Sequence, residues 1–223
     1  MLGTNRRVDH AFRSAVLLGA LLVTAKGTRA AEVGPPARGV ELAFRTGVLF
    51  PGGDVEINTF PDPDQAGPVS LSNWFKSQFP LWVDVGYRFD RWFVGAYGQY
   101  AFGIPAFCSG PAPSTCSAFA VRVGLEVQFH PADWKLVDPW FELGLGYEWD
   151  SWRRALDSGE VFVVTFHGWE VLRLGVGLDF AVAEALRLGP FIGFSLGQFQ
   201  RLSSDATKPA LHYWFCVGLK LTH

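Results

Sequence analysis

The feature that most constrains this chain is strict alternation between apolar and polar residues in several long segments. The clearest segment is 120–129, AVRVGLEVQF, where every odd position is apolar and the even positions carry Arg122, Gly124, Glu126 and Gln128. A period of two indicates an extended strand, because successive side chains of a strand point to opposite faces of the sheet. One face of each strand is therefore continuously apolar, while the other mixes glycine with charge.

Eight such segments follow one another along the chain. Most of them have ten residues or more, which is longer than the usual strand of a soluble protein and suits a tilted membrane-spanning strand. We predict strands near residues 40–50, 79–89, 92–103, 119–129, 140–149, 168–180, 186–199 and 211–222. Short connections alternate with long ones, and the four long loops are expected at 51–78, 104–118, 150–167 and 200–210. This arrangement is typical of an up-and-down transmembrane barrel.

The composition agrees with an all-β chain. Of the 223 residues, 49% are hydrophobic and 15% are aromatic, yet the sequence contains no apolar run of the length that a membrane-spanning helix needs. Twenty-five glycines suit strands whose inner faces are crowded. The predicted fold class is therefore an eight-stranded antiparallel up-and-down transmembrane β-barrel.

The N-terminal residues read as a targeting segment. Arg6, Arg7 and Arg13 precede the apolar run 14–25, and Thr28-Arg29-Ala30 offers small residues for cleavage. We expect a signal peptide at 1–30, a short linker at 31–39 and the barrel at 40–223. Cleavage would remove five of the nineteen basic residues and one of the twenty-one acidic ones, leaving a net charge of −6. That charge argues against nucleic acid as a partner.

The register of the strands predicts what fills the barrel. A two-residue turn at Asp90-Arg91 would place Phe89 opposite Trp92, so that both belong to the outer, apolar face. Trp82, Tyr97, Trp140 and Trp214 then fall on the inner face together with six acidic and six basic residues, which must pair because an unpaired buried charge is costly. The predicted interior charge network comprises Glu41, Arg45, Asp84, Arg88, Arg122, Glu126, Glu142, Glu148, Arg173, Asp179, Arg187 and Lys220. An eight-stranded barrel is just wide enough for side chains to fill, so we expect a plugged lumen.

The segments 141–147 (FELGLGY) and 171–180 (VLRLGVGLDF) and the alternating last strand carry a family resemblance. The chain resembles the small eight-stranded outer-membrane barrels of Gram-negative bacteria, of the kind that forms the membrane domain of outer-membrane protein A. The resemblance implies a location in the outer membrane, contact with its lipid and lipopolysaccharide, and insertion by the outer-membrane assembly machinery. It implies a terminal aromatic residue as well, but this sequence ends in His223.

The cysteines predict one disulfide bond. Cys108 and Cys116 lie eight residues apart in the Pro-rich sequence CSGPAPSTC of the second long loop, and in an oxidising compartment such a pair forms a disulfide. Cys216 has inward parity in the last strand and is expected to be a free, buried thiol.

No residue pattern predicts catalysis, a cofactor or a metal site. His167 and His212 lie near the loop end with Ser151, Ser203 and Ser204, but no local motif makes a nucleophile of any of these serines. The acidic residues of the first long loop lack the spacing of a calcium loop, and a solvated loop is the favoured interpretation. They are Asp54, Glu56, Asp62 and Asp64.

Four functions stay open on the sequence alone. The favoured one is an integral outer-membrane barrel with a structural or surface-interaction role, in which the long loops contact an unidentified surface partner. The alternative is a soluble, secreted lipocalin-like barrel that binds an apolar ligand and turns its charged face to water. A small pore and a lipid-modifying hydrolase or acyltransferase are less favoured, because the inner charges are balanced and no catalytic motif is found.

Overall fold

The computed structural model describes residues 38–58, 67–106, 108, 114–131, 136–201 and 207–223. All of these belong to one structural unit, Val33–His223. The expected signal peptide at 1–30 and all but the last two residues of the expected linker at 31–39 lie outside the described residues.

Long antiparallel strands account for most of the described chain. The eight strands that form the barrel wall are β1 (Gly39–Asn58), β3 (Phe75–Phe89), β4 (Trp92–Pro105), β5 (Ser114–Phe129), β6 (Val137–Leu156), β7 (Val161–Ala183), β8 (Leu186–Arg201) and β10 (Leu211–Thr222). Three short elements accompany them: β2 (Gly67–Ser70), the 3₁₀ turn η2 (Leu71–Asn73) and β9 (Thr207–Pro209). No helix among the described residues has the length and hydropathy needed to cross a membrane.

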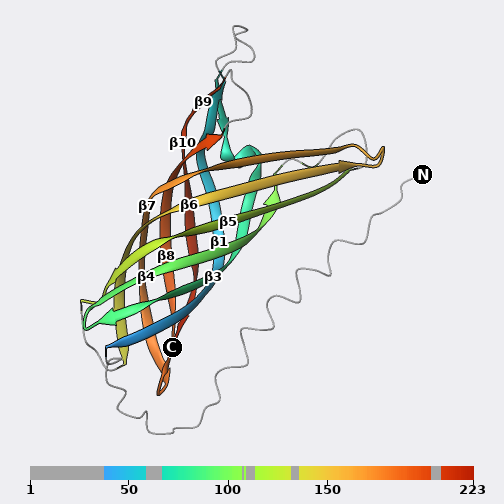
Figure 1. Ribbon diagram of the computed structural model, residues 1–223. Coiled ribbons are helices and arrows are strands. Elements are labelled where there is room, and N and C mark those ends of the chain that lie inside the picture. Colours follow the sequence, from blue (N-terminus) through green and yellow to red (C-terminus); the bar gives the residue numbers. More distant parts are fainter. Residues whose placement is uncertain (1–37, 59–66, 107, 109–113, 132–135, 202–206) are drawn as a thin grey trace. The chain divides into compact units, whose positions relative to one another are not determined.

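The wall strands close into a ring (Figure 1). Each pairs with its neighbours in the sequence, and β10 returns to pair with β1 from Ala43–Thr222 to Gly53–His212. The predicted eight-stranded up-and-down barrel is confirmed. The end that holds the β3–β4, β5–β6 and β7–β8 connections and His223 is called the turn end below, and the opposite end is called the loop end.

The turn at Asp90-Arg91 sets the register as predicted. Phe89 pairs with Trp92, and Asp90 has a φ of 53°, a left-handed conformation that aspartate tolerates better than most residues. From this turn the pairing of β3 with β4 continues to Gln78–Gly103 without a shift. The apolar sets of both strands therefore face outward together.

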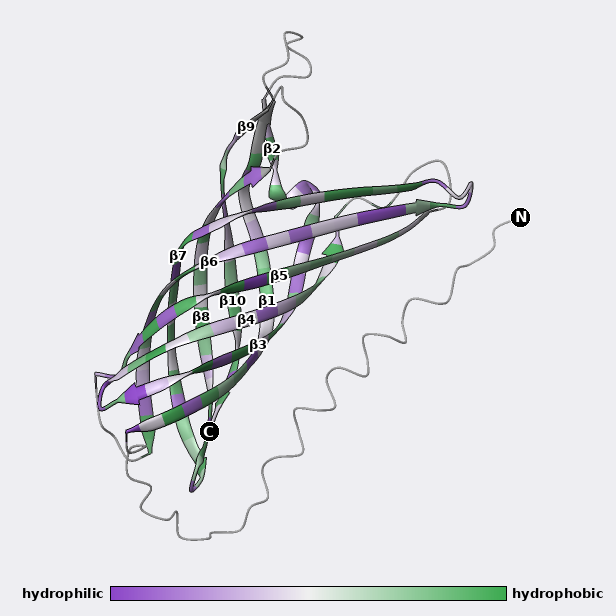
Figure 2. Ribbon diagram, viewed as in Figure 1, coloured by the Kyte–Doolittle hydropathy of each residue, from purple (hydrophilic) through white to green (hydrophobic). Residues whose placement is uncertain are grey.

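The alternation of burial along each strand shows which face is outside. In β10 the exposed positions carry Tyr213, Phe215, Val217 and Leu219, whereas the intervening positions are mostly buried. The same stripes of apolar and polar residues run along the strands in Figure 2. The polar face is the inner one, so the molecule has the reverse of the usual arrangement of a soluble protein.

Much of what we expected to be loop at the loop end is strand. β1 continues to Asn58, β5 begins at Ser114, and β6 and β7 are joined only by residues 157–160. Antiparallel pairing satisfies the backbone groups of these segments, which is why extended hairpins form where the sequence shows no strict alternation. The expected loop at 150–167 is therefore a projecting hairpin.

Two arms extend the barrel at the loop end (Figure 1). The first arm is the end of β1 (51–58), which pairs with β2 and β9 rather than with the barrel wall alone. The second arm is formed by the start of β5 (114–118), the end of β6 (152–156) and the start of β7 (161–164). Both arms are continuous with wall strands, so the barrel holds them in place.

Candidate functional site

The interior of the barrel brings the predicted charges together. The exposed fraction of every one is below 8%. The twelve residues are Glu41, Arg45, Asp84, Arg88, Arg122, Glu126, Glu142, Glu148, Arg173, Asp179, Arg187 and Lys220. They fall into three levels along the barrel axis.

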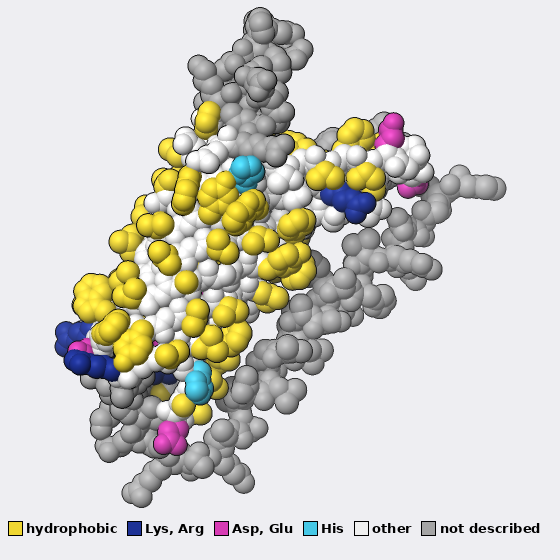
Figure 3. All heavy atoms as spheres, viewed as in Figure 1, with side chains coloured by type: hydrophobic (Ala, Val, Ile, Leu, Met, Phe, Trp, Pro, Cys, Tyr) yellow, Lys and Arg dark blue, Asp and Glu magenta, His cyan; other side chains and the backbone are white. Residues whose placement is uncertain are grey.

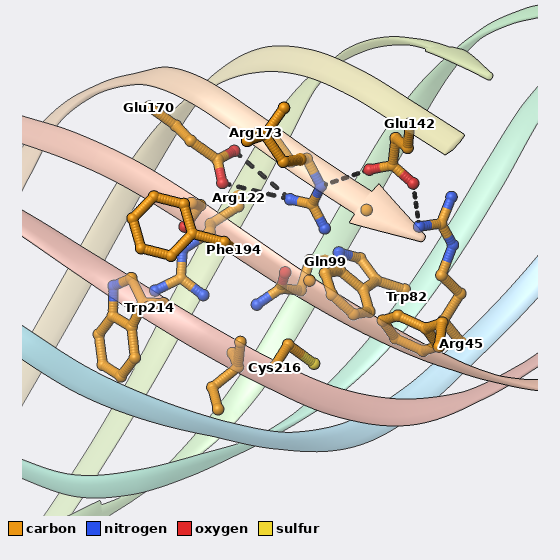
Figure 4. Close-up of a pocket in the computed structure, with 16 residues that line it drawn as sticks. Arg45, Trp82, Gln99, Arg122, Glu142, Glu170, Arg173, Phe194, Trp214 and Cys216 are labelled. Carbon is orange, nitrogen blue, oxygen red and sulfur yellow. Dashed lines mark hydrogen bonds and ion pairs between the residues drawn. The ribbon is translucent and has the colours of Figure 1, made fainter. Parts of the chain in front are cut away.

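Arg45 organises the middle level. Its Nε donates to Asp84 Oδ2 at 2.6 Å, Nη2 lies 3.1 Å from Glu126 Oε2, and Nη1 donates to Glu142. Glu142 is shared, because its Oε1 accepts from Arg173 Nε at 2.9 Å (Figure 4). Arg173 also lies 4.1 Å from the ring centroid of Tyr97, a cation–π distance. Two guanidinium groups therefore hold several carboxylates in one network.

Arg122 organises the level toward the loop end. Its Nε donates to Glu148 Oε2 at 3.1 Å, and Nη2 lies 3.5 Å from Asp150 Oδ1. The Nε2 atom of buried His212 contacts the other oxygen of Glu148. The guanidinium carbon of Arg122 lies 4.8 Å from the ring centroid of Trp214. This level therefore combines a histidine with two residues of the predicted charge network, Arg122 and Glu148.

Asp138 organises the level toward the turn end. Its Oδ2 lies 2.9 Å from Arg88 Nη2 and 2.9 Å from Arg187 Nη1, while Oδ1 lies 2.9 Å from His130 Nδ1. Nearby, Lys220 Nζ lies 3.3 Å from Asp179 Oδ2. The carboxylate of Asp138 thus forms ion pairs with two arginines, Arg88 and Arg187.

The predicted balance of six acids and six bases is wrong. Among the described residues nine acids are buried against six Arg and Lys residues, because Asp138, Asp150 and Glu170 join the predicted set. Asp138 and Asp150 lie in sequence at the edges of the expected strands, so alternation did not assign them to a face. The nine acids share six basic side chains, and His130 and His212 add hydrogen bonds to Asp138 and Glu148.

Glu170 was missed for a different reason. A bulge between Glu170 and Leu172 changes the parity of β7, so that Glu170 and Arg173 both face inward although they are three residues apart. Arg173 Nη1 lies 3.4 Å from Glu170 Oε1, and Tyr97 Oη donates to the same carboxylate. Strict alternation would have placed Glu170 on the outer face, where it would meet lipid.

An aromatic cluster closes the interior at the loop end. Leu71 of η2 and Phe75 at the start of β3 are completely buried, and the ring of Phe75 contacts the inward-facing Trp214. Ring centroids lie 5.4 Å apart for Trp74 and Trp152, and 5.3 Å apart for Phe166 and Phe199, within the range of favourable aromatic pairs. We call Leu71, Trp74, Phe75, Trp152, Phe166 and Phe199 the mouth cluster. The first long loop is thus partly inside the barrel, which the sequence did not indicate.

The interior cavity is small. It measures about 20 Å³ and is lined by Arg45, Trp82, Gln99, Arg173 and Cys216, among others (Figure 4). A volume of this size holds about one water molecule.

The outer face of the wall is apolar over its whole middle section. Exposed apolar side chains are found on all eight wall strands, and on the visible face in Figure 3 the charged side chains gather at the two ends. The lipocalin-like alternative requires the charged face outside and the apolar face around a ligand, which is the opposite of what is observed. That alternative is therefore wrong.

The histidines and serines considered for catalysis do not form a common site among the described residues. His212 is buried against Glu148, whereas the ring of His167 lies on the outer side, where Tyr147 Oη and His167 Nδ1 are 2.6 Å apart. Ser151 is buried in β6 and pairs with Thr165 in the sheet. Ser203 and Ser204 lie outside the described residues, as do Asp62 and Asp64 of the first loop.

The cysteines lie as expected from their positions in the sequence. Cys108 and Cys116 form a disulfide with a Cα–Cα distance of 5.8 Å, which ties the second arm to the chain that follows β4. Cys216 is free and buried in the middle of β10.

The pKa values of Asp90 and His130, both at the turn end, are lowered. Arg38 Nη2 lies 3.0 Å from Asp90 Oδ2, and this hydrogen bond and charge lower the pKa of the exposed Asp90. Burial lowers the pKa of His130, because desolvation disfavours the imidazolium more than its hydrogen bond to Asp138 favours it.

No family model and no curated protein sequence matches this chain. Its structure is similar to that of a major outer membrane protein from Thermus thermophilus, with 12% identity, a TM-score of 0.48 and coverage of 83% of this chain and 99% of the other. Ail, the attachment invasion locus protein of Yersinia pestis, has 14% identity, a TM-score of 0.40 and coverage of 82% and 98%. The outer membrane protease OmpT from Escherichia coli has 7% identity, a TM-score of 0.45 and coverage of 85% and 97%. The assignment of the barrel fold rests on the strand pairing described above.

Proposed function

We propose that this chain is an integral outer-membrane barrel of a Gram-negative bacterium, with a closed interior and a structural or surface-interaction role. The observation that carries the proposal is the inverted burial: charged side chains fill the interior and apolar side chains cover the outside. In water, such an outer face would be an aggregation liability, whereas in a bilayer it is the face that lipid solvates.

The edge of the apolar belt can be located on β6. On the outer face, Tyr147 and Trp149 are followed by Ser151 and exposed Arg153, so the apolar side chains give way to polar ones. Aromatic side chains favour the boundary between hydrocarbon and headgroups. We infer that Trp149 on β6 and Trp169, which pairs with Tyr147 from β7, lie at the membrane surface on the loop-end side, and that the second arm projects beyond it.

The closed interior supports a scaffold role rather than conduction. Ion pairs cross the interior between strands that are not adjacent, such as Arg45 on β1 with Glu142 on β6. Such cross-links resist deformation of the wall and hold the arms in fixed positions. Binding residues are commonly carried on loops above a rigid scaffold, so the two arms are the proposed contact surface for an unidentified partner.

Contacts with lipopolysaccharide and with the outer-membrane assembly machinery belong to the same proposal. On this proposal the aromatic boundary lies at the height of the outer-leaflet headgroups, and the arms project beyond it. The outward residues of β10 alternate in the manner of a terminal barrel strand, although His223 follows them in place of an aromatic residue.

The proposal is tested by expressing the full chain in a Gram-negative host, separating the membranes and comparing unboiled with boiled samples by gel electrophoresis. We expect recovery in the outer-membrane fraction and a heat-dependent mobility shift. Recovery in the soluble periplasm would overturn the membrane assignment. Steady conductance steps of the purified protein in a planar bilayer would overturn the closed interior while leaving the barrel in place.

A further inference from the structure

The outer wall carries a groove at the junction of β6, β7, β8 and β10. The groove has a volume of about 370 Å³, which is in the range of small-molecule sites. Its sides are apolar and outward-facing: Phe141, Leu174, Val176, Ile192, Phe194 and Phe215. It is therefore a depression in the face that the proposed function puts in contact with lipid.

The floor of the groove is formed by backbone rather than by side chains. Gly175 of β7 pairs directly with Gly193 of β8, so two adjacent strands lack a side chain at the same height. Both positions face inward, and a Cβ atom built on Gly193 would point toward the interior, where its nearest neighbours would be Leu174 O at 3.5 Å and Cys216 Cβ at 3.6 Å. Neither strand adds an inward side chain to the wall at this height.

The interior cavity lies directly behind this floor. Groove and cavity share five lining residues, among them Gly175, Gly193 and Glu142. Both carboxylate oxygens of Glu142 are already engaged, one by Arg173 and the other by Arg45 (Figure 4). The floor therefore offers no free polar group to a ligand, and the occupant must be apolar.

The height of the groove limits what that occupant can be. Gly193 pairs with Cys216, which lies in the middle of β10. If the wall strands span the bilayer, this position is deep in the hydrocarbon core, where only acyl chains are present. Headgroups lie too far toward either end of the barrel to reach it.

We propose that the groove over Gly175 and Gly193 binds one acyl chain of a membrane lipid. The inference rests on the proposed membrane location. An empty groove in this face would forfeit the dispersion contacts of its lining, whereas one hydrocarbon chain restores them.

The test uses the folded protein in vesicles that contain a phospholipid with a photoactivatable diazirine near the end of one acyl chain. After irradiation, cross-linked peptides are mapped by mass spectrometry. We expect cross-links to concentrate on residues 174–176 and 192–194, several times above the average of the other outward positions. Val176→Phe fills the groove and is expected to reduce these cross-links to that average.

Val94→Phe is the matched control, because Val94 is an exposed outward residue of β4 on another part of the wall. It should leave the cross-links at the groove unchanged. Ile192→Phe provides a second groove-filling variant if Val176→Phe fails to fold.

Cross-links spread evenly over the eight strands, or unaffected by either filling variant, would overturn the proposal. Failure of the underlying membrane location is distinguishable, since the protein would then show no heat-dependent mobility shift and no association with the vesicles.

Discussion

The middle of the barrel and its loop end use opposite polarity on the same strands. Along the inner face of β6, Glu148 and Asp150 are followed by Trp152, while on the outer face Trp149 is followed by Arg153. β7 shows the same change, from Arg173 inside the ring to Phe166 in the mouth cluster. The surroundings of each section explain the difference. In the middle, hydrocarbon solvates the apolar outer side chains and the polar ones lie inside, whereas at the loop end water solvates the polar outer side chains and the apolar ones lie inside.

The comparison also separates two ways of filling an interior. The middle section is held by ion pairs and cation–π contacts that require fixed partners. The mouth cluster is held by apolar packing, which depends on volume and shape. The ion-paired middle section is therefore more sensitive to the removal of a single side chain than the mouth cluster. The largest loss of stability is expected for a substitution in the middle section.

Replacing Arg45 by Met leaves the carboxylates of Asp84, Glu126 and Glu142 without their shared cation. Removing one partner of a buried ion pair costs about 3–5 kcal/mol of unfolding free energy. Urea unfolding in lipid vesicles, followed by the mobility shift, measures this loss. Arg38→Met is the control, because the Arg38–Asp90 pair is exposed and its removal should leave the unfolding midpoint unchanged. Equal midpoints for both variants would show that the interior pairs do not stabilise the barrel.

Val123→Arg places a charge on the outer face of β5, where 45% of the valine is exposed. We expect a cost of about 2–4 kcal/mol and impaired insertion, as for Arg at the bilayer midplane. Ser117→Arg lies on the same face of the same strand but in the second arm, above the inferred membrane surface, and should insert normally. If both variants insert equally well, the boundary between the two regions is misplaced.

The reactivity of Cys216 tests whether water reaches the interior of the middle section. It is buried against the interior cavity and is the free thiol among the described residues. A water-soluble maleimide should fail to label the folded barrel and should label the protein fully in urea. Rapid labelling of the folded form would mean that water reaches the middle section. Cys216→Ser, which lacks the thiol, is the control for labelling elsewhere.

His130 gives the smallest expected effect and concerns the turn end. Its pKa is lowered in the folded state, so below the usual histidine pKa of about 6.5 the unfolded chain binds more protons than the folded one. The stability associated with neutral His130 is therefore fully present above that pH and is lost as the pH falls below it. His130→Gln should flatten the dependence of the unfolding midpoint between neutral and mildly acidic pH. If the unfolding midpoint depends on pH in the same way with and without the substitution, groups other than His130 cause that dependence.

The sequence predicted the middle of the barrel well, because two demands act there on every residue. Lipid requires an apolar side chain at one position and the narrow interior requires a small or paired polar one at the next, so the pattern has to alternate. The turn at Asp90-Arg91 then shows which alternate positions face inward, and the inward positions of Arg122 and Trp214 are predicted correctly from it.

The same reasoning failed where one of those demands is absent. A single bulge reverses the parity beyond it, and nothing in the residues around Glu170 announces the bulge. On the proposed membrane position the arms have water outside, so their strands need not alternate strictly, and the sequence predicts loops there. Burial of Leu71 and Phe75 depends on how the first loop folds back, which is a tertiary contact without a local pattern.

The seam between β1 and β10 has a consequence for the order of events during folding. Leu42 and His223 exchange two backbone hydrogen bonds there, so the first strand of the ring finds its second partner only in the last. Until that contact forms, the sheet has two open edges whose amide and carbonyl groups cannot be satisfied by hydrocarbon. A partly closed sheet is therefore excluded from the bilayer core, and the ring is expected to close at the membrane in one cooperative step, with its edges protected until then.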